Sequence, residues 1–233
     1  GSYDLVSSYV NNGQLDAQFN FNLYDTALPV FIDSKASFKT LDDQIKKTFS
    51  VYGVNHLMGN LMDSHDKVRF MAFADGDITL ADAMNSGETG WTNPPEVDNE
   101  SSYKKLKLKM VYLQTIPGLP VVYYGDEFGM TGAADPDNRR MMKFGDELKK
   151  IEQQTFTEIS KIINLRRKLS ALRYGDFITL QTDENIYAYI RSDMNERVVT
   201  ILNKSSNDDF ITLLLPEVYQ LEKAVDMISG EEY

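Results

Sequence analysis

GLPVVYYGDEFGMTGAADPDNRR, residues 118–140, is the stretch that decides the fold. It opens with a short apolar run rich in valine and tyrosine and then changes abruptly to glycines and charged side chains. Residues 61–70, LMDSHDKVRF, have the same organisation, with an apolar pair followed by polar residues. Such a pattern is typical of a short buried strand that ends in a polar loop. Both stretches therefore indicate strands that deliver side chains to a site.

Helical and strand-like patterns alternate over the first 172 residues, as expected for a parallel sheet with crossover helices. Apolar and polar side chains alternate over residues 15–24, which predicts a strand. Thr40 and Asp43 have the spacing of a capping box, so a helix is expected to start at Thr40. The expected strands are residues 15–24, 59–65 and 119–124, and the further expected helices are residues 100–115 and 147–170.

After about residue 172 the pattern changes to short β-prone runs separated by turn-forming clusters, which predicts a small antiparallel domain. The runs are residues 177–180, 186–191, 197–202 and 210–215. A complete (β/α)8 TIM barrel takes about 250 residues, and three parallel strands alone would leave two open sheet edges. We therefore expect an α/β chain with part of a (β/α)8 barrel in residues 1–172 and a small all-β domain in residues 173–233.

Composition excludes several classes of protein. The net charge of −11 argues against nucleic-acid binding and against docking on anionic membranes, because both need a positive surface. The chain has no cysteine and two histidines, so a thiolate or histidine metal centre is not expected, and the compartment stays open between secreted, periplasmic and other locations. No apolar run is long enough to span a bilayer. A neutral substrate such as a sugar fits this balance.

Ser64-His65-Asp66 follows the apolar pair Leu61-Met62 at the end of an expected strand. Taken alone the tripeptide is typical of a surface turn. In a barrel, however, the carboxyl ends of the strands form the active face. For Asp63, the expected role is a hydrogen bond to backbone at the strand end rather than chemistry, and His56 is interpreted as structural.

Together the two stretches resemble the α-amylase family of glycoside hydrolases, glycoside hydrolase family 13. The resemblance covers nearly the whole chain, as the sixth, seventh and eighth barrel strands and the C-terminal β-domain. It implies that Asp66 stabilises the transition state and that His65 binds a hydroxyl of the same sugar ring. The family usually has asparagine where this chain has Ser64, so one local hydrogen bond is expected to be lost or rerouted.

The resemblance also implies a sugar subsite in the second stretch. Asp135 and Arg139 have the family spacing of the residues that bind a glucose on the non-reducing side of the cleaved bond. A carboxylate can accept from vicinal hydroxyls, and a guanidinium donates in a planar fork. The open alternative is a solvated turn with a local ion pair. Tyr123 and Tyr124 are better interpreted as core packing residues than as pocket residues, whereas Trp91 fits sugar stacking and loop packing equally well. The loop 75–99 is expected beside the cleft.

A retaining glycosidase also needs a carboxylate nucleophile and a general acid, and neither motif is found in this chain. We therefore expect the chain to be a fragment that lacks the N-terminal half of the barrel and is inactive by itself. The substrate class implied by the resemblance is an α-glucan, with no cofactor in this chain and calcium restricted to a full-length parent. The alternative is a non-catalytic glucan-binding or scaffold relative. Open sheet edges predict self-association of the isolated piece.

Overall fold

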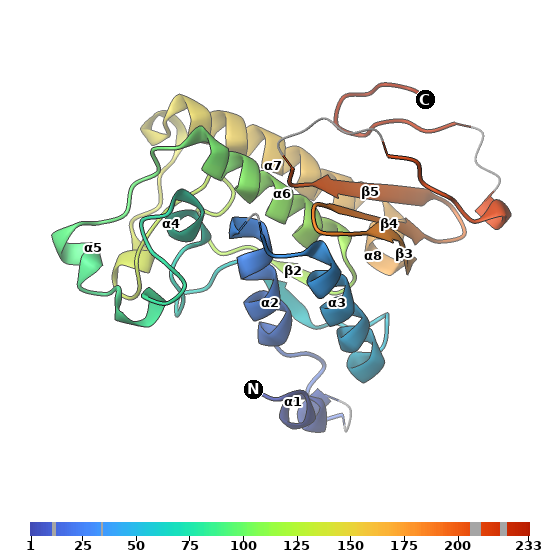
Figure 1. Ribbon diagram of the computed structural model, residues 1–233, viewed down its shortest axis with the longest axis horizontal. Coiled ribbons are helices and arrows are strands. Elements are labelled where there is room, and N and C mark those ends of the chain that lie inside the picture. The colour runs from blue at the N-terminus through green and yellow to red at the C-terminus, as the bar shows by residue number, and fades with distance from the viewer. Residues whose placement is uncertain (11–12, 34, 206–210, 220–222) are drawn as a thin grey trace.

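The computed structural model describes residues 1–10, 13–33, 35–205, 211–219 and 223–233, in which helices pack around two small sheets (Figure 1). The α-helices are α1 (Tyr3–Val10), α2 (Phe21–Ile32), α3 (Phe38–Tyr52), α4 (Phe70–Asp75), α5 (Thr89–Thr92), α6 (Glu100–Thr115), α7 (Lys150–Lys168) and α8 (Ser170–Tyr174). The strands are β1 (Gly59–Leu61), β2 (Leu119–Val121), β3 (Asp176–Thr182), β4 (Ile186–Ser192) and β5 (Arg197–Asn203).

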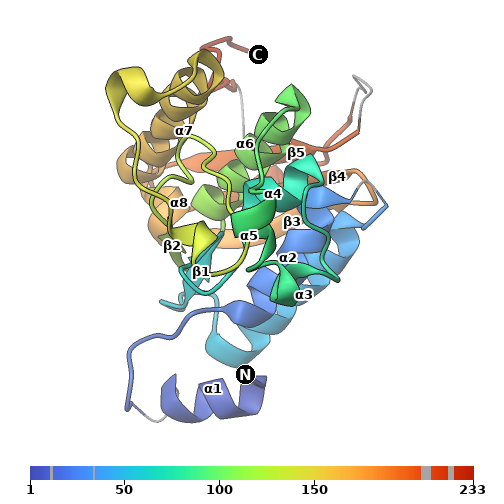
Figure 2. The same cartoon turned by 90° about the vertical axis from the view of Figure 1, so that its left-hand side faces the viewer.

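The first sheet is parallel and places the two sequence stretches side by side. β1 and β2 pair in register, with Gly59 opposite Leu119, and Phe19 forms an isolated parallel bridge to Gly59. The Asn20 amide donates to the Gly59 carbonyl at 2.8 Å. Because these segments run in the same direction, their carboxyl ends meet at one edge (Figure 2). The strands predicted near residues 59–65 and 119–124 are therefore present, although each is shorter than predicted.

The strand predicted over residues 15–24 is wrong except at the Phe19 bridge. Helix α2 begins at Phe21, where the Asn20 side chain accepts from the backbone amide of Leu23 at 3.3 Å and caps the helix. The buried side chains then follow a helical period, with Leu23, Ala27 and Phe31 facing the core. The alternation of apolar and polar residues does not produce a strand here, because tertiary burial and the helix cap both favour a helix.

Helix α3 is present, but the predicted start at Thr40 is wrong. The helix begins at Phe38, because the Ser37 hydroxyl accepts from the Lys39 backbone amide at 3.1 Å and caps the end. Leu41 and Ile45, one turn apart on this helix, are fully buried and face the core. Helices α6 and α7 lie within the ranges predicted for them and pack against each other (Figure 1).

The second sheet is antiparallel with strand order β3-β4-β5, and it is separate from the first. All seven residues of β4 are buried. Arg191 on β4 donates to the carbonyl oxygens of Thr115 at 2.8 Å and Leu172 at 3.0 Å, which ties this sheet to α6 and α8. Of the last β-prone run, Phe210 lies outside the described residues and residues 211–215 form no strand, so that prediction is wrong for the described part.

No helix among the described residues is long and apolar enough to cross a membrane.

Candidate active site

Side chains from two loops meet beyond the carboxyl ends of β1 and β2. His65 and Asp66 follow β1, with the His65 Nε2 atom 3.3 Å from Asp66 Oδ1. Asp135 and Arg139 come from the loop after β2, with Arg139 in the short 3₁₀ helix η2 (Asp137–Arg139). Arg139 Nε lies 3.4 Å from Asp135 Oδ1, and Arg139 Nη2 lies 3.9 Å from Asp66 Oδ1. The structure thus brings together all four residues that the sequence singled out.

These four side chains face solvent. The side chains of His65 and Asp66 are 65% and 67% exposed, and those of Asp135 and Arg139 are 55% and 45% exposed. Exposed ion pairs add little to stability, typically about 0–1 kcal/mol. The cluster therefore presents hydrogen-bond acceptors and a guanidinium fork to solvent.

Ser64 accepts hydrogen bonds within the turn through its side chain and its backbone carbonyl. Its hydroxyl accepts from the Asp66 backbone amide at 3.3 Å, and its carbonyl accepts from the Lys67 amide at 3.3 Å. A hydroxyl in place of an amide therefore still fixes the start of the His65-Asp66 turn.

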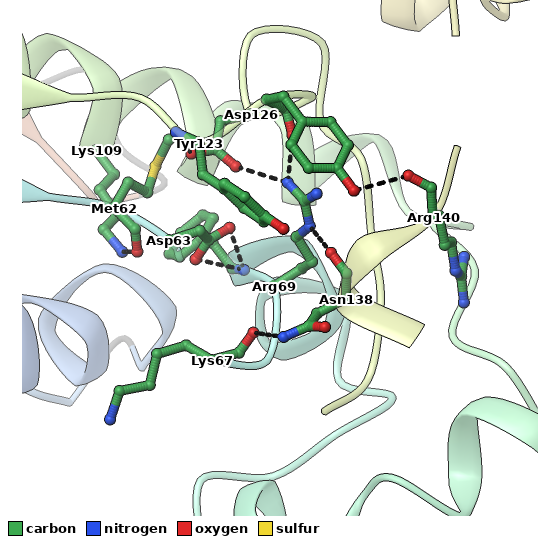
Figure 3. A network of polar contacts seen from close by, with 11 residues as sticks. Met62, Asp63, Lys67, Arg69, Lys109, Tyr123, Asp126, Asn138 and Arg140 are labelled. Atoms are coloured by element: carbon green, nitrogen blue, oxygen red, sulfur yellow. Dashed lines mark hydrogen bonds and ion pairs between the residues drawn. The ribbon is translucent and has the colours of Figure 1, made fainter. Parts of the chain in front are cut away.

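Asn138 is a site residue that the sequence analysis did not identify. Its side chain is fully buried, and its amide Nδ2 donates to the carbonyl oxygens of His65 at 2.8 Å and Lys67 at 2.9 Å. Figure 3 shows it between the two loops. Arg139 also donates to the His65 carbonyl, from Nε and from Nη2, at 3.2 Å each. The partners are about 70 residues apart along the chain, so no local pattern could have revealed the contact.

Arg69 anchors both loops from below. Its guanidinium is completely buried and donates to the Tyr124 carbonyl at 2.6 Å, to the Asn138 carbonyl at 2.9 Å and to the Asp126 carboxylate at 3.2 Å. It also lies over the Tyr123 ring, 4.1 Å from the ring centroid (Figure 3). Tyr123 and Tyr124 are half-buried against this arginine, in agreement with a packing role.

Buried charges lie beneath the strand ends. Both carboxylate oxygens of Asp63 accept from the Phe70 backbone amide, at 3.0 and 2.8 Å, which confirms the structural role predicted for Asp63. Burial raises the pKa of Asp63, and the charges of Lys109 and Arg69 oppose this shift. Burial and the neighbouring Asp63 carboxylate raise the pKa of Asp126, and Arg69 opposes that shift. Burial lowers the pKa of Lys109 to about 8, although the two carboxyls act in the opposite direction. All three side chains are buried and do not face solvent.

The loop over residues 75–99 lies against the site. The Arg140 guanidinium binds the Asp137 carboxylate at 2.7 Å and donates to the Pro95 carbonyl at 2.9 Å. A Cβ atom on Gly90 would come within 2.4 Å of Asp137 Cβ, so the two loops are in close contact. The expected position of this loop beside the site is therefore confirmed, and Trp91 is largely exposed at its surface.

His56 lies in a buried position away from the exposed cluster. The His56 imidazole is buried and accepts from the Met58 amide at 3.2 Å, in keeping with a structural role. Within the part of the chain that the structure describes, no group of three or more histidine, aspartate or glutamate side chains is arranged to hold a metal ion.

Sequence comparisons identify relatives over most of the chain. The family model described as the alpha-amylase catalytic domain matches residues 1–167. A cyclomaltodextrinase of Thermoanaerobacter pseudethanolicus is 29% identical over 210 residues, which is 89% of this chain and 32% of that protein. Neopullulanase 2 of Thermoactinomyces vulgaris is 27% identical over 97% of this chain and 35% of its own length. The chain spans about a third of the length of these curated relatives.

Solved structures of α-amylases superpose on nearly the whole of this chain. An Anoxybacillus α-amylase superposes with a TM-score of 0.77 at 28% identity, covering 98% of this chain and 44% of that one. The Geobacillus thermoleovorans α-amylase, solved with acarbose, gives a TM-score of 0.77 at 27% identity over 99% of this chain and 46% of its own.

Proposed function

This chain belongs to the α-amylase family, and from that premise we propose that it forms the C-terminal part of a retaining glycosidase acting on α-linked glucans. The observation that supports this most strongly is the exposed cluster of His65, Asp66, Asp135 and Arg139 at the carboxyl ends of two parallel strands. We assign residues 1–172 to the last three βα units of a (β/α)8 barrel and residues 173–233 to a C-terminal β-domain. The separation of the parallel pair β1-β2 from the antiparallel sheet β3-β4-β5 supports this division.

In this proposal Asp66 stabilises the transition state. As the glycosidic bond breaks, positive charge develops on the sugar ring, and a fixed carboxylate gains interaction energy with that charge. His65 binds a hydroxyl of the same ring. Asp135 accepts from hydroxyls of the next glucose on the non-reducing side, and Arg139 donates to it. The nucleophile and the general acid, about 5–5.5 Å apart in retaining enzymes, come from a part of the parent protein that precedes these residues.

The substrates we propose are starch, pullulan, maltooligosaccharides or cyclodextrins. The names of the relatives, cyclomaltodextrinase and neopullulanase, support this range. The acidic surface is compatible with these neutral substrates, because no charge on the sugar has to be matched.

The first test is reducing-sugar release from starch, pullulan and cyclodextrin by the parent protein and its Asp66→Asn variant. Loss of a preorganised electrostatic group typically lowers kcat by about 10²–10³-fold, and we expect a loss of at least that size. Asp146→Asn, which removes an exposed carboxylate from the loop before α7, is the matched control and should retain activity. Equal activity in the parent and in Asp66→Asn would contradict the role of Asp66.

The 233-residue chain alone is expected to release no reducing sugar, because neither the carboxylate nucleophile nor the general acid is found in it. Activity of the purified chain would contradict the proposal that the nucleophile and the general acid lie outside these residues. A parent protein inactive on all three glucans would favour the alternative function, a non-catalytic glucan-binding or scaffold subunit.

A further inference from the structure

Asn138 occupies an unusual position, completely buried between the two loops that carry the candidate site. Both groups that face its amide nitrogen are backbone carbonyls, those of His65 and Lys67, so the NH₂ group has to point toward them. The side-chain oxygen Oδ1 is buried and has no hydrogen-bond partner among the residues that the structure describes. An unpaired buried oxygen is unfavourable, which indicates that the two donated hydrogen bonds are what this position requires.

We propose that Asn138 is a positioning residue that sets the geometry of His65 and Asp66, an inference that rests on the proposed function. The His65 carbonyl belongs to the peptide group that joins His65 to Asp66. A donor on that carbonyl fixes the plane of the peptide and therefore the directions in which both side chains leave the backbone. Because Asn138 directly precedes Arg139, the same residue sets the distance between the turn and the sugar subsite.

Arg69 gives Asn138 a fixed base. The Asn138 carbonyl accepts from Arg69 Nε at 2.9 Å, and the same guanidinium is held by the Tyr124 carbonyl and the Asp126 carboxylate (Figure 3). A continuous series of contacts thus connects the buried interior with the exposed site. Asn138 is the last fully buried member of that series.

Arg139 also donates to the His65 carbonyl, and its exposure gives a reason for Asn138 to act as a second donor to that oxygen. The Nε and Nη2 atoms of Arg139 both donate to that carbonyl, yet the side chain is 45% exposed. When Arg139 turns toward a sugar hydroxyl, these bonds to the carbonyl are weakened or lost. Asn138 keeps the carbonyl paired, so the turn stays in place while Arg139 binds the ligand.

The direct test is NMR spectroscopy of the 233-residue chain, which does not depend on activity. Asn138→Leu keeps a similar size and removes both donors. We expect the His65 carbonyl ¹³C resonance to move upfield and the Asp66 amide resonance to shift, because the carbonyl between them loses a hydrogen bond. The chain has two histidines, so the imidazole signal of buried His56 reports in the same sample whether the fold is intact and should not move.

Asn60→Leu is the matched control. Asn60 is also a buried asparagine whose amide donates to a backbone carbonyl, that of Pro117 at 2.8 Å, but it does not touch the His65-Asp66 turn. Its loss should disturb His56 and leave the His65 carbonyl signal unchanged. If Asn138→Leu does not fold, Asn138→Ser retains one donor and should give an intermediate shift. Unchanged His65 and Asp66 signals in a folded Asn138 variant, or equal changes at His56, would overturn the inference.

Kinetics of the parent protein provide the second measurement. A displacement of about 1 Å in a catalytic group can cost about 100-fold in rate, so Asn138→Leu should lower kcat by about 10–100-fold and change KM much less. An active parent whose kcat is unaffected by Asn138→Leu would refute positioning by Asn138. A parent without any activity would instead refute the proposed function, while the NMR experiment would still decide the role of Asn138.

Discussion

The two histidines show how burial decides the role of a side chain. His65 lies at the surface of the candidate site, 65% exposed and 3.3 Å from a carboxylate. His56 lies in the segment before β1, packs against the Phe49 ring and accepts from the Met58 amide. Burial, and to a smaller extent the charge of Arg191, lowers the pKa of His56 to about 4.

His56 should therefore make stability depend on pH. Its pKa in the folded chain is lower than the ordinary value of about 6.5, so between these values the unfolded chain binds the extra proton. The stabilisation is complete above about pH 6.5 and is lost as the pH falls through about 4, by up to about 3 kcal/mol. His56→Asn, whose side-chain oxygen can still accept from Met58, should lose less stability between pH 7 and pH 4 when unfolded with urea.

The control for this experiment is His65→Asn, which removes the exposed imidazole and should leave the wild-type dependence on pH in place. If His56→Asn loses as much stability as the wild type over the same range, then burial of His56 is not what couples stability to pH.

At the same scale, sequence reasoning identified the exposed members of the site and missed the buried ones. His65, Asp66, Asp135 and Arg139 lie in short motifs, so neighbouring letters were enough to select them. The proposed role of Asn138 depends on hydrogen-bond partners in the other loop. The distance between the two loops is set by the pairing of β1 with β2. A sequence alone does not contain that information in any local window.

At the scale of elements, the turn into β2 depends on one glycine. Gly118 has a φ of +104°, and a Cβ atom there would lie 2.6 Å from the Asn60 side-chain nitrogen and 2.9 Å from the Met58 carbonyl. The absence of a side chain lets this turn approach β1 closely enough for the parallel pairing. The positions of the two site loops therefore depend on this contact.

Gly118→Ala should lower the free energy of unfolding by about 2–4 kcal/mol, since it combines backbone strain with overpacking. Gly53→Ala is the matched control, because Gly53 also has a positive φ of +83° but has nothing within 4 Å of its Cβ position. Backbone strain alone should cost about 1–2 kcal/mol there. Equal losses in the two variants, measured by urea denaturation, would show that close approach to β1 is unimportant.

The elements also show where periodicity succeeds and where it fails. Helices α6 and α7 were predicted because each has an apolar face over several turns and a clear boundary. Residues 15–24 were misread because the alternation spans the junction between the Phe19 bridge and helix α2. The cap at Asn20 is the physical signal for that junction, and a period-2 count across it ignores the cap.

At the scale of the whole molecule, the parallel strands leave an apolar row uncovered. Phe19, Gly59 and Leu119 lie opposite one another across the sheet, and the two large side chains are 53% and 48% exposed. In the described ranges no further strand pairs with β2 or with the Phe19 segment. Exposed apolar rows at open sheet edges favour association, and in the proposed parent the rest of the barrel would cover this one.

The isolated chain should therefore self-associate as its concentration rises, and sedimentation velocity measures this directly. The double variant Phe19→Lys and Leu119→Lys places charges in the row, so it should remain monomeric at concentrations at which the wild type associates. Met194→Lys is the control, since Met194 is 98% exposed at the turn between β4 and β5, away from the parallel strands. Association that persists in the double variant, or that Met194→Lys abolishes equally, would assign the contact to another surface. Association that the double variant alone removes would locate it at the edge where the proposed barrel continues.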